Sequence, residues 1–492
     1  MLLQSPSQNV PLRHHRQRQT VPARFLLALL TLLLLAASAD FAQQLPEDAR
    51  AIVAQAQSEY LHGQWTEAAA TYEKAIVMAP KNVEIRIALG LALAKASRFP
   101  EAIASYDAAL QLAPHNSSAE VALAEAYRAV HNEDEARRLL ERSAREHPKS
   151  AAPLAVLGDL ELEMQTYDAS IKHLTAAVSL DPADNETRDR LAAAYKAKGA
   201  AAEALAQLAK SLAHDPNDAL AHFLRAEIYD SQNDDAHALP EAEKVLALQP
   251  QNHRGRTLLA KILLRVAETQ QGPDAAATCA RAADLVQPVA DAQPNDSETL
   301  FLLSRAYRCA GKTGDEKKIL TAFEAASKTQ RSSRENENQA LHLVQQANDR
   351  ALHNDLPGAL DLLQQALEKN PDYGAAYSLL AKLYYSAGDI DKASDAISRA
   401  LQLAPFQPDF LYVQGKIFEK QGKLDEAISV FQRATLVNPK ESDAYFELGA
   451  VYQQQNDPVR AEAAYEKAVQ LSPGDPDYRR ALASLSSAPP SP

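Results

Sequence analysis

The fold of this chain is decided by residues 442–475, SDAYFELGAVYQQQNDPVRAEAAYEKAVQLSPGD. The large residues Tyr445, Leu448 and Tyr452 are three or four positions apart, a spacing that places side chains on one face of an α-helix. Gly449 is small enough for a second helix to approach closely. Pro473 lacks an N–H group and has a fixed φ, so it ends that second helix. The stretch therefore predicts a pair of helices joined by a turn.

The proline of this stretch returns throughout the chain at one constant interval. It recurs in two evenly spaced series, one of six and one of four: Pro80, Pro114, Pro148, Pro182, Pro216 and Pro250, then Pro371, Pro405, Pro439 and Pro473. So strict a period is typical of a stacked repeat protein. Each unit buries its apolar face only against its neighbours, and the units are stable together.

The pattern resembles the tetratricopeptide repeat (TPR). With Ser442 as position 1, large residues fall at positions 4, 7, 11 and 24, small residues at 8, 20 and 27, and proline at 32. Leu89, Gly90 and Tyr106 before Pro114 repeat these marks, and the resemblance covers residues 49–475. It implies an all-α fold, a right-handed superhelical solenoid of about twelve helix-turn-helix units in two arrays.

Breaks in the period predict the domain boundaries. The first array is expected over residues 49–328, with irregular units 7 and 8, because the proline that closes unit 7 comes ten residues late, at Pro294. The turn signal near Gly272 predicts that the ten additional residues of unit 7 lie around residues 268–274. They would form either a loop insertion or a projecting loop that contacts a partner. The polar residues 329–339 predict a hinge, or a solvated helix extension that joins the arrays. The second array is expected over residues 340–473, with a capping helix and a disordered tail over residues 474–492.

The N-terminus predicts export. Four arginines precede an apolar run over residues 25–37, and the step Ala37-Ser38-Ala39 follows it. This is the pattern of a secretory signal peptide over residues 1–39, cut after Ala39. The run is short for a membrane-spanning helix. We expect an exported protein, periplasmic or secreted, or alternatively one anchored in the inner membrane by residues 25–37.

Composition and motifs indicate a chain that is not an enzyme. The formal charge of −13 argues against nucleic acid and anionic membranes as main partners. Membrane contact is expected only through the N-terminal segment, if that segment is not cleaved. The sequence has no phosphate-binding loop, nucleophile elbow or zinc-protease signature. We therefore expect no catalytic residues, no metal and no cofactor.

The family resemblance places the binding surface on the first helix of each unit, at positions 2, 5, 9, 12 and 13. In the second array these positions predict an aromatic, basic groove for a protein or peptide that carries carboxylates: Tyr385, Tyr412, Phe446, Lys382, Lys416, Lys420, Asn348, Gln453 and Gln454. In the first array they predict a mostly acidic groove: Tyr60, Phe223, Lys196, Glu84, Glu125, Asp159, Glu163, Glu186, Asp189, Glu227 and Asp230.

The chain has two cysteines, Cys279 and Cys309, on helices expected to pack together. If the chain is exported, the oxidising compartment could convert them to a disulfide. The alternative is that both remain buried free thiols.

Together these patterns predict a protein-binding scaffold outside the cytoplasm. The alternatives are an accessory subunit of envelope secretion, polysaccharide-export or glycosyl-transfer machinery, and a structural element that self-associates.

Overall fold

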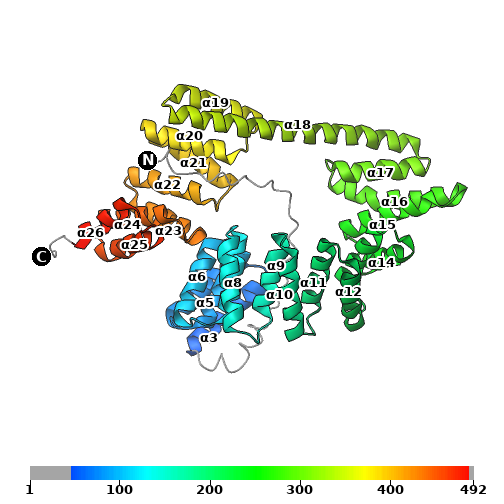
Figure 1. Cartoon of the computed structure of the whole chain (residues 1–492), viewed down its shortest axis with the longest axis horizontal. Helices are drawn as coiled ribbons and strands as arrows, with labels where there is room; N and C mark the ends of the chain where they lie inside the picture. The colour runs from blue at the N-terminus through cyan, green and yellow to red at the C-terminus, as the bar shows by residue number, and fades with distance from the viewer. Residues whose placement is uncertain (1–45, 487–492) are drawn as a thin grey trace. The chain divides into compact units, whose positions relative to one another are not determined.

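The computed structural model describes residues 46–486, and in that range the chain is all α-helical (Figure 1). Consecutive helices pack as pairs, which confirms the predicted solenoid of helix-turn-helix repeats. Twelve pairs follow one another, with one further helix at the C-terminus. Repeats are numbered 1 to 12 below, and positions within each repeat are counted as for Ser442.

The first six repeats have helices of nearly uniform length. Their pairs are α3 (Glu47–Leu61) and α4 (Trp65–Met78), α5 (Val83–Lys95) and α6 (Phe99–Leu112), α7 (Ser117–Ala129) and α8 (Glu133–Glu146), α9 (Ala152–Glu163) and α10 (Tyr167–Leu180), α11 (Asn185–Lys198) and α12 (Ala201–His214), and α13 (Ala219–Ser231) and α14 (Asp235–Leu248).

The later repeats contain the longest helices. The helices from repeat 7 onward are α15 (His253–Glu268), α16 (Gly272–Ala292), α17 (Ser297–Cys309), α18 (Thr313–Leu352), α19 (Leu356–Lys369), α20 (Gly374–Ala387), α21 (Ile390–Leu403), α22 (Pro408–Lys420), α23 (Leu424–Val437), α24 (Ser442–Gln454), α25 (Pro458–Leu471) and α26 (Pro476–Ser486). The N-terminal part of α18 completes repeat 8, and its C-terminal part opens repeat 9.

The turn between repeats is fixed by the residue that comes two places after the proline. Asn82, Asn116 and Asp184 each accept a hydrogen bond on the side chain from the backbone N–H three residues later. This N-cap satisfies one of the donors that a helix leaves free at its start. The repeat period therefore sets both the end of one helix and the start of the next.

The turn inside each repeat is equally regular. In eleven repeats the residue at position 15 has a positive φ, as at Gly199, Gly388 and Gln165. The left-handed backbone ends the first helix and reverses the chain into the second. Repeat 7 is the exception, because its residue of positive φ is Gly272, at the start of α16.

Repeat 7 accommodates its surplus by lengthening both helices. α15 has 16 residues and α16 has 21, whereas α13 and α14 of the preceding repeat have 13 and 14. The three and seven extra residues account for the ten by which Pro294 is late. The predicted loop insertion at residues 268–274 is therefore wrong, since only three residues separate the two helices.

The polar residues 329–339 lie inside one continuous helix, α18, which has 40 residues. The hinge expected there is not a break in the helix, and the alternative reading, a solvated helical extension, is the one that the structure shows. Residues 328–335 are all exposed, which explains why this part of the helix has no apolar stripe.

The packing divides the chain into two compact units. A continuous unit comprises residues 137–334. A discontinuous unit comprises residues 1–136 and 335–492, of which the structure describes 46–136 and 335–486. The boundaries fall inside α8 and α18, so they differ from the predicted division into two arrays.

The two segments of the discontinuous unit are joined by a set of contacts that we call the clasp: Phe99, Asn132, Glu135, Phe406, Val437 and Lys440. The Phe99 and Phe406 rings meet edge to face at 5.7 Å. The Asn132 side-chain amide donates to the Val437 carbonyl at 2.7 Å, and Lys440 lies 3.2 Å from the nearly buried Glu135 carboxylate.

The clasp buries a surface that other repeats leave open. At position 30, Met78, Leu112 and Leu180 are exposed, whereas Val437 is only 2% exposed.

The predicted capping helix is present as α26. Its Ala481, Leu482 and Leu485 pack against the core of α24 and α25, which closes the last apolar face of the stack. The predicted signal peptide and disordered tail, residues 1–39 and 487–492, lie outside the described residues. Among the helices that are described, none is both long and apolar enough to cross a membrane.

The two cysteines form a disulfide in the continuous unit. Cys279 on α16 is fully buried, and Cys309 is the last residue of α17. Their Cα atoms are 5.6 Å apart, within the range that a disulfide requires. Of the two readings left open by the sequence, the structure therefore shows the disulfide.

Candidate functional site

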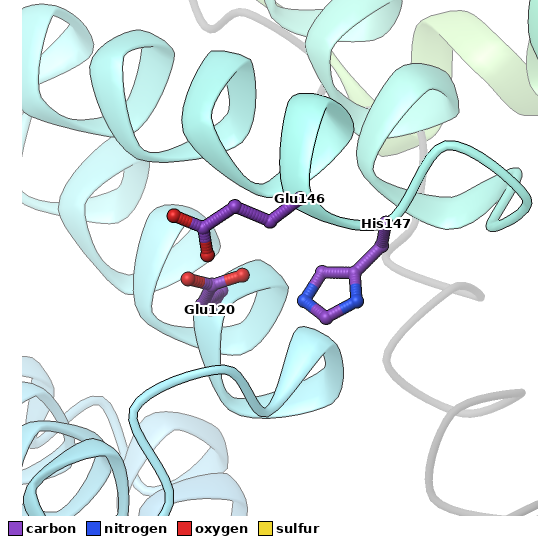
Figure 2. Close-up of side chains that lie close together, drawn as sticks. All are labelled: Glu120, Glu146 and His147. Carbon is purple, nitrogen blue, oxygen red and sulfur yellow. The ribbon is translucent and has the colours of Figure 1, made fainter.

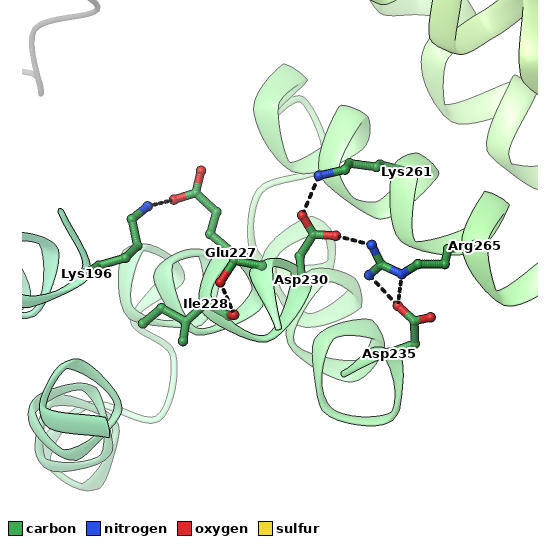
Figure 3. Close-up of polar contacts among 8 residues, drawn as sticks. Lys196, Glu227, Ile228, Asp230, Asp235, Lys261 and Arg265 are labelled. Atoms are coloured by element: carbon green, nitrogen blue, oxygen red, sulfur yellow. Dashed lines mark hydrogen bonds and ion pairs between the residues drawn. The ribbon is translucent and has the colours of Figure 1, made fainter. Parts of the chain in front are cut away.

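The first helix of each repeat carries a face formed by positions 2, 5, 9, 12 and 13, which we call the first-helix face. In the continuous unit, ion pairs join this face from one repeat to the next. Figure 3 shows Lys196 of α11 paired with Glu227 of α13. It also shows Asp230 of α13 between Lys261 and Arg265 of α15, at 2.7 and 2.9 Å. The pairs of Lys196 with Glu227 and of Asp230 with Lys261 each join position 12 of one repeat to position 9 of the next.

These pairs change the predicted acidic groove of the first array. Glu227 and Asp230 are neutralised by cations of neighbouring helices, and Arg190 lies 2.6 Å from Glu186 and 3.9 Å from Asp159. Asp159, Glu227 and Asp230 are therefore each paired with a cation of an adjacent first helix, whereas Glu186 is paired within α11.

Asp189 was predicted at groove position 5, but the structure buries it at 1% exposure. Burial raises the pKa of Asp189 to about 8, the neighbouring Asp218 carboxylate adds to the rise, and Ser211 and Arg188 oppose it. The side chain is therefore largely neutral at pH 7 and belongs to the packing of repeats 5 and 6, not to an anionic binding surface.

In the second array, Tyr412 and Lys416 of α22 meet Glu447 of α24. The Tyr412 hydroxyl lies 3.1 Å from Glu447 Oε1, and the Lys416 ammonium lies 2.7 Å from both Glu447 Oε2 and Glu419 Oε2. Burial opposes the charge on Lys416, but Glu447 and Glu419 outweigh it, and the pKa of Lys416 is raised. Lys416 is therefore a charged but internally satisfied cation.

Phe446 and Gln453 also have partners within the chain. The Phe446 ring stacks on Tyr478 of α26 at 4.9 Å and lies 5.6 Å from Tyr465. The Gln453 side-chain oxygen accepts a hydrogen bond from the Tyr465 hydroxyl at 3.0 Å. Phe446 thus helps to seat the capping helix.

The other four predicted groove residues keep their polar groups open. Asn348 on α18, Lys382 and Tyr385 on α20 are half-buried, and Lys420 on α22 is exposed. In the described part of the chain, neither lysine makes an ion pair. The structure thus separates the eight predicted residues into four that are held internally and four that remain open to a partner.

Sequence reasoning missed the first-helix face of repeats 7 and 8. Six residues occupy groove positions on α15 and α17: Arg254, Lys261, Arg265, Phe301, Arg305 and Arg308. The repeat pattern already contains their register, because His253 and Ser297 each come three residues after a proline, Pro250 and Pro294. The signal that could have found them is the N-cap Asp296, which restarts the register at Ser297.

Candidate metal ligands are few among the described side chains. Figure 2 shows Glu120 of α7, with Glu146 and His147 at the end of α8. Glu120 belongs to the discontinuous unit and is fully buried, whereas Glu146 and His147 belong to the continuous unit. We assign no metal or cofactor to these residues.

Two family models, both of the tetratricopeptide repeat, match the chain. One matches residues 53–117 and 412–476, and the other matches residues 93–160 and 351–417. Each therefore finds the repeat in both the N-terminal and the C-terminal part of the chain. No curated protein matches the sequence.

Several solved structures are similar to the chain at low sequence identity. The APC/C hetero-tetramer Cut9–Hcn1 is 13% identical and the match covers 94% of this chain and 99% of that chain, with a TM-score of 0.35. YrrB, described as a TPR protein with an unusual peptide-binding site, is 23% identical over 37% of this chain and 95% of its own, with a TM-score of 0.31. MamA is 24% identical over 28% and 81%, with a TM-score of 0.27.

Proposed function

Because this chain is a tetratricopeptide repeat protein, we propose that it is a non-catalytic scaffold whose first-helix faces hold segments of partner proteins. One observation carries the proposal. Lys382, Tyr385 and Lys420 stand at groove positions with no partner for their charged or hydroxyl groups in the described chain, while the core beneath them is closed. Tyrosine is enriched at the centres of protein interfaces, and the two lysine charges can attract and orient an acidic partner.

We also propose that the scaffold works outside the cytoplasm. The pattern of residues 1–39 supports export, and so does the Cys279–Cys309 disulfide, because oxidising compartments preserve such bonds. N-terminal sequencing of the protein purified from its natural source tests this. A first residue of Asp40 is expected for a cleaved, exported chain. Recovery of intact residues 1–39 from a cytosolic fraction would contradict it.

Site-specific photo-cross-linking tests the scaffold function. A photoreactive phenylalanine analogue replaces Tyr385 on the first-helix face, and in a control variant it replaces Val459, which is 75% exposed on the second helix α25. After irradiation of whole cells, the Tyr385 variant is expected to form discrete adducts and the Val459 variant is not.

The mass of the adduct separates the alternatives. An adduct of twice the chain mass would identify a second copy of this chain as the partner, in favour of a self-associating element. Equal labelling from both positions would contradict the assignment of binding to the first-helix face.

A further inference from the structure

We propose that α15 and α17 form a docking face for an acidic segment of a partner protein that carries an aromatic or aliphatic side chain. We call it the basic face: Arg254, Lys261, Arg265, Phe301, Arg305 and Arg308. The inference rests on the proposed scaffold function and names one surface and one partner chemistry for it.

The charge of the two helices is opposite to that of the chain. α15 and α17 contain six lysines or arginines and two glutamates, Glu268 and Glu298, a net charge of +4, whereas the whole chain carries −13. Five of the six cations occupy groove positions of repeats 7 and 8. All five are paired with acidic side chains, so the sign of the charge that a partner meets depends on which member of each pair is exposed.

Exposure separates three of the five cations from the acids that they contact. Arg254, Lys261 and Arg308 are 56–63% exposed, whereas their partners Glu227, Asp230 and Glu316 are only 8–24% exposed. At these three pairs the acid lies beneath and holds the cationic side chain in place, so positive charge is presented to solvent. At Arg305 the order is reversed, because the arginine is 44% exposed and its partner Glu268 is 65% exposed. Guanidinium groups held in this way can bind a carboxylate through two parallel hydrogen bonds.

The face also offers an apolar anchor. Phe301 stands at position 5 of repeat 8 and is 48% exposed, with its ring 5.4 Å from that of Phe323 on α18. Arg305 follows it by one helical turn, so a cation and an aromatic ring lie side by side. Half-exposed aromatic rings beside arginine are the residues enriched at the centres of protein interfaces.

The disulfide makes this surface rigid. Cys309 directly follows Arg308 and ties the end of α17 to α16. At the other edge, the Arg254 guanidinium lies 4.8 Å from the centre of the Phe223 ring of α13. A face whose side chains are already positioned loses less conformational entropy when a partner binds.

The acidic protein segment is favoured over nucleic acid for two reasons. The strong negative charge of the whole chain repels a long polyanion. In addition, Glu268, 65% exposed, and Glu298 interrupt the cations, which suits a short segment with separated carboxylates better than a continuous phosphate backbone.

The test uses the full disulfide-bonded chain and three short fluorescent peptides of equal length. One alternates Asp or Glu with Phe, a second has Lys at the acidic positions, and a third has Ala in place of Phe. Fluorescence anisotropy is measured at low and at roughly threefold higher salt. The acidic Phe peptide is expected to bind best, and more weakly at higher salt, because ions screen its attraction.

Two matched variants locate the site. Arg305→Glu on α17 and Arg281→Glu on α16 reverse arginines of similar exposure, 44% and 52%, each paired with one glutamate of a neighbouring repeat. Arg305→Glu and Phe301→Ala are each expected to weaken binding about tenfold, and Arg281→Glu is expected to leave it unchanged.

Several results would overturn the inference. These are equal binding by Arg305→Glu and the unaltered chain, equal binding of the lysine peptide, no binding of any peptide up to about 1 mM, or tighter binding of an oligothymidine of matched charge. If cross-linking from Tyr385 still succeeds in any of these cases, the scaffold function stands and only the basic face is lost.

Discussion

In repeats 11 and 12, glycine at position 8 makes room for an aromatic ring at position 24. A Cβ atom on Gly415 would lie 2.5 Å from the Phe431 ring, and one on Gly449 would lie 2.6 Å from the Tyr465 ring. In repeat 10, where position 24 is the smaller Ile397, position 8 is Ala381. The sequence pattern predicts this close approach directly, because both residues lie within one repeat.

Gly415→Ala is expected to lower the free energy of unfolding by about 1–3 kcal/mol, because the added methyl group forces Phe431 out of its packed position. Urea denaturation followed by circular dichroism measures this. Gly314→Ala is the control, since nothing lies within 4 Å of its added Cβ in α18. There a helix-favouring alanine stabilises by up to about 1 kcal/mol. Equal effects of the two substitutions would refute the packing account.

Asp189 shows where residue patterns stop being informative. Its position in the repeat predicts a solvated groove acid, but its burial depends on Ser211 at the end of α12 and on the turn that holds Asp218. Those contacts are set by how repeats 5 and 6 pack, which a single-repeat pattern does not contain.

The raised pKa of Asp189 predicts a pH dependence of stability. Its pKa is about 8 in the folded chain and about 4 in the unfolded chain, so the folded state binds more protons between these values. This contribution to stability is fully present below about pH 4 and is lost as the pH rises through about 8. The urea midpoint of the unaltered chain should therefore fall more between pH 5.5 and 8.5 than that of Asp189→Asn. Parallel curves for the two proteins would show that Asp189 is not buried as described.

At the scale of elements, the helices of the regular repeats were predictable. The lengthened helices of repeat 7 and the single helix α18 that joins repeats 8 and 9 were not. Proline, the N-cap and the residue of positive φ fix both ends of each ordinary helix. In repeat 7 the turn signal at Gly272 was found correctly, but Pro288 lies inside α16 without ending it. In α18 a polar stretch fits a hinge and a solvent-exposed helix equally well, because neither has an apolar stripe to bury.

The link between α16 and α17 is expected to contribute measurably to stability. Closing a loop over a sequence separation of 30 residues removes unfolded-state entropy equivalent to about 3–4 kcal/mol. Adding reductant should therefore lower the melting temperature of the unaltered chain. The double variant Cys279→Ser with Cys309→Ser should melt at the lower temperature with or without reductant. A melting temperature that reductant does not change would contradict the disulfide.

At the scale of the whole molecule, one feature departs from a simple stack of neighbours. The clasp joins residues about 300 positions apart within the discontinuous unit. No repeat pattern encodes such a contact, since the period describes only how adjacent repeats pack. The sequence therefore predicted the solenoid and its number of repeats, but not the division of the chain into two units.

The clasp predicts that two distant helices are stabilised together. Lys440→Glu places a second acid beside the buried Glu135 carboxylate and should weaken the contact. Hydrogen exchange is expected to quicken in both residues 99–112 and 424–437. Arg399→Glu is the control, because its partner Asp372 lies 2.8 Å away within the C-terminal segment of the same unit. Faster exchange confined to residues 424–437 would show that the clasp does not couple the two segments.

The central claim is that partners bind on the first helices of the repeats. Hydrogen exchange of the full chain with and without its cross-linked natural partner tests this most directly. We predict that protection increases on first helices, such as α15, α17, α20 and α22, and stays unchanged on the second helices α16, α21 and α23. Protection confined to the second helices would contradict the account.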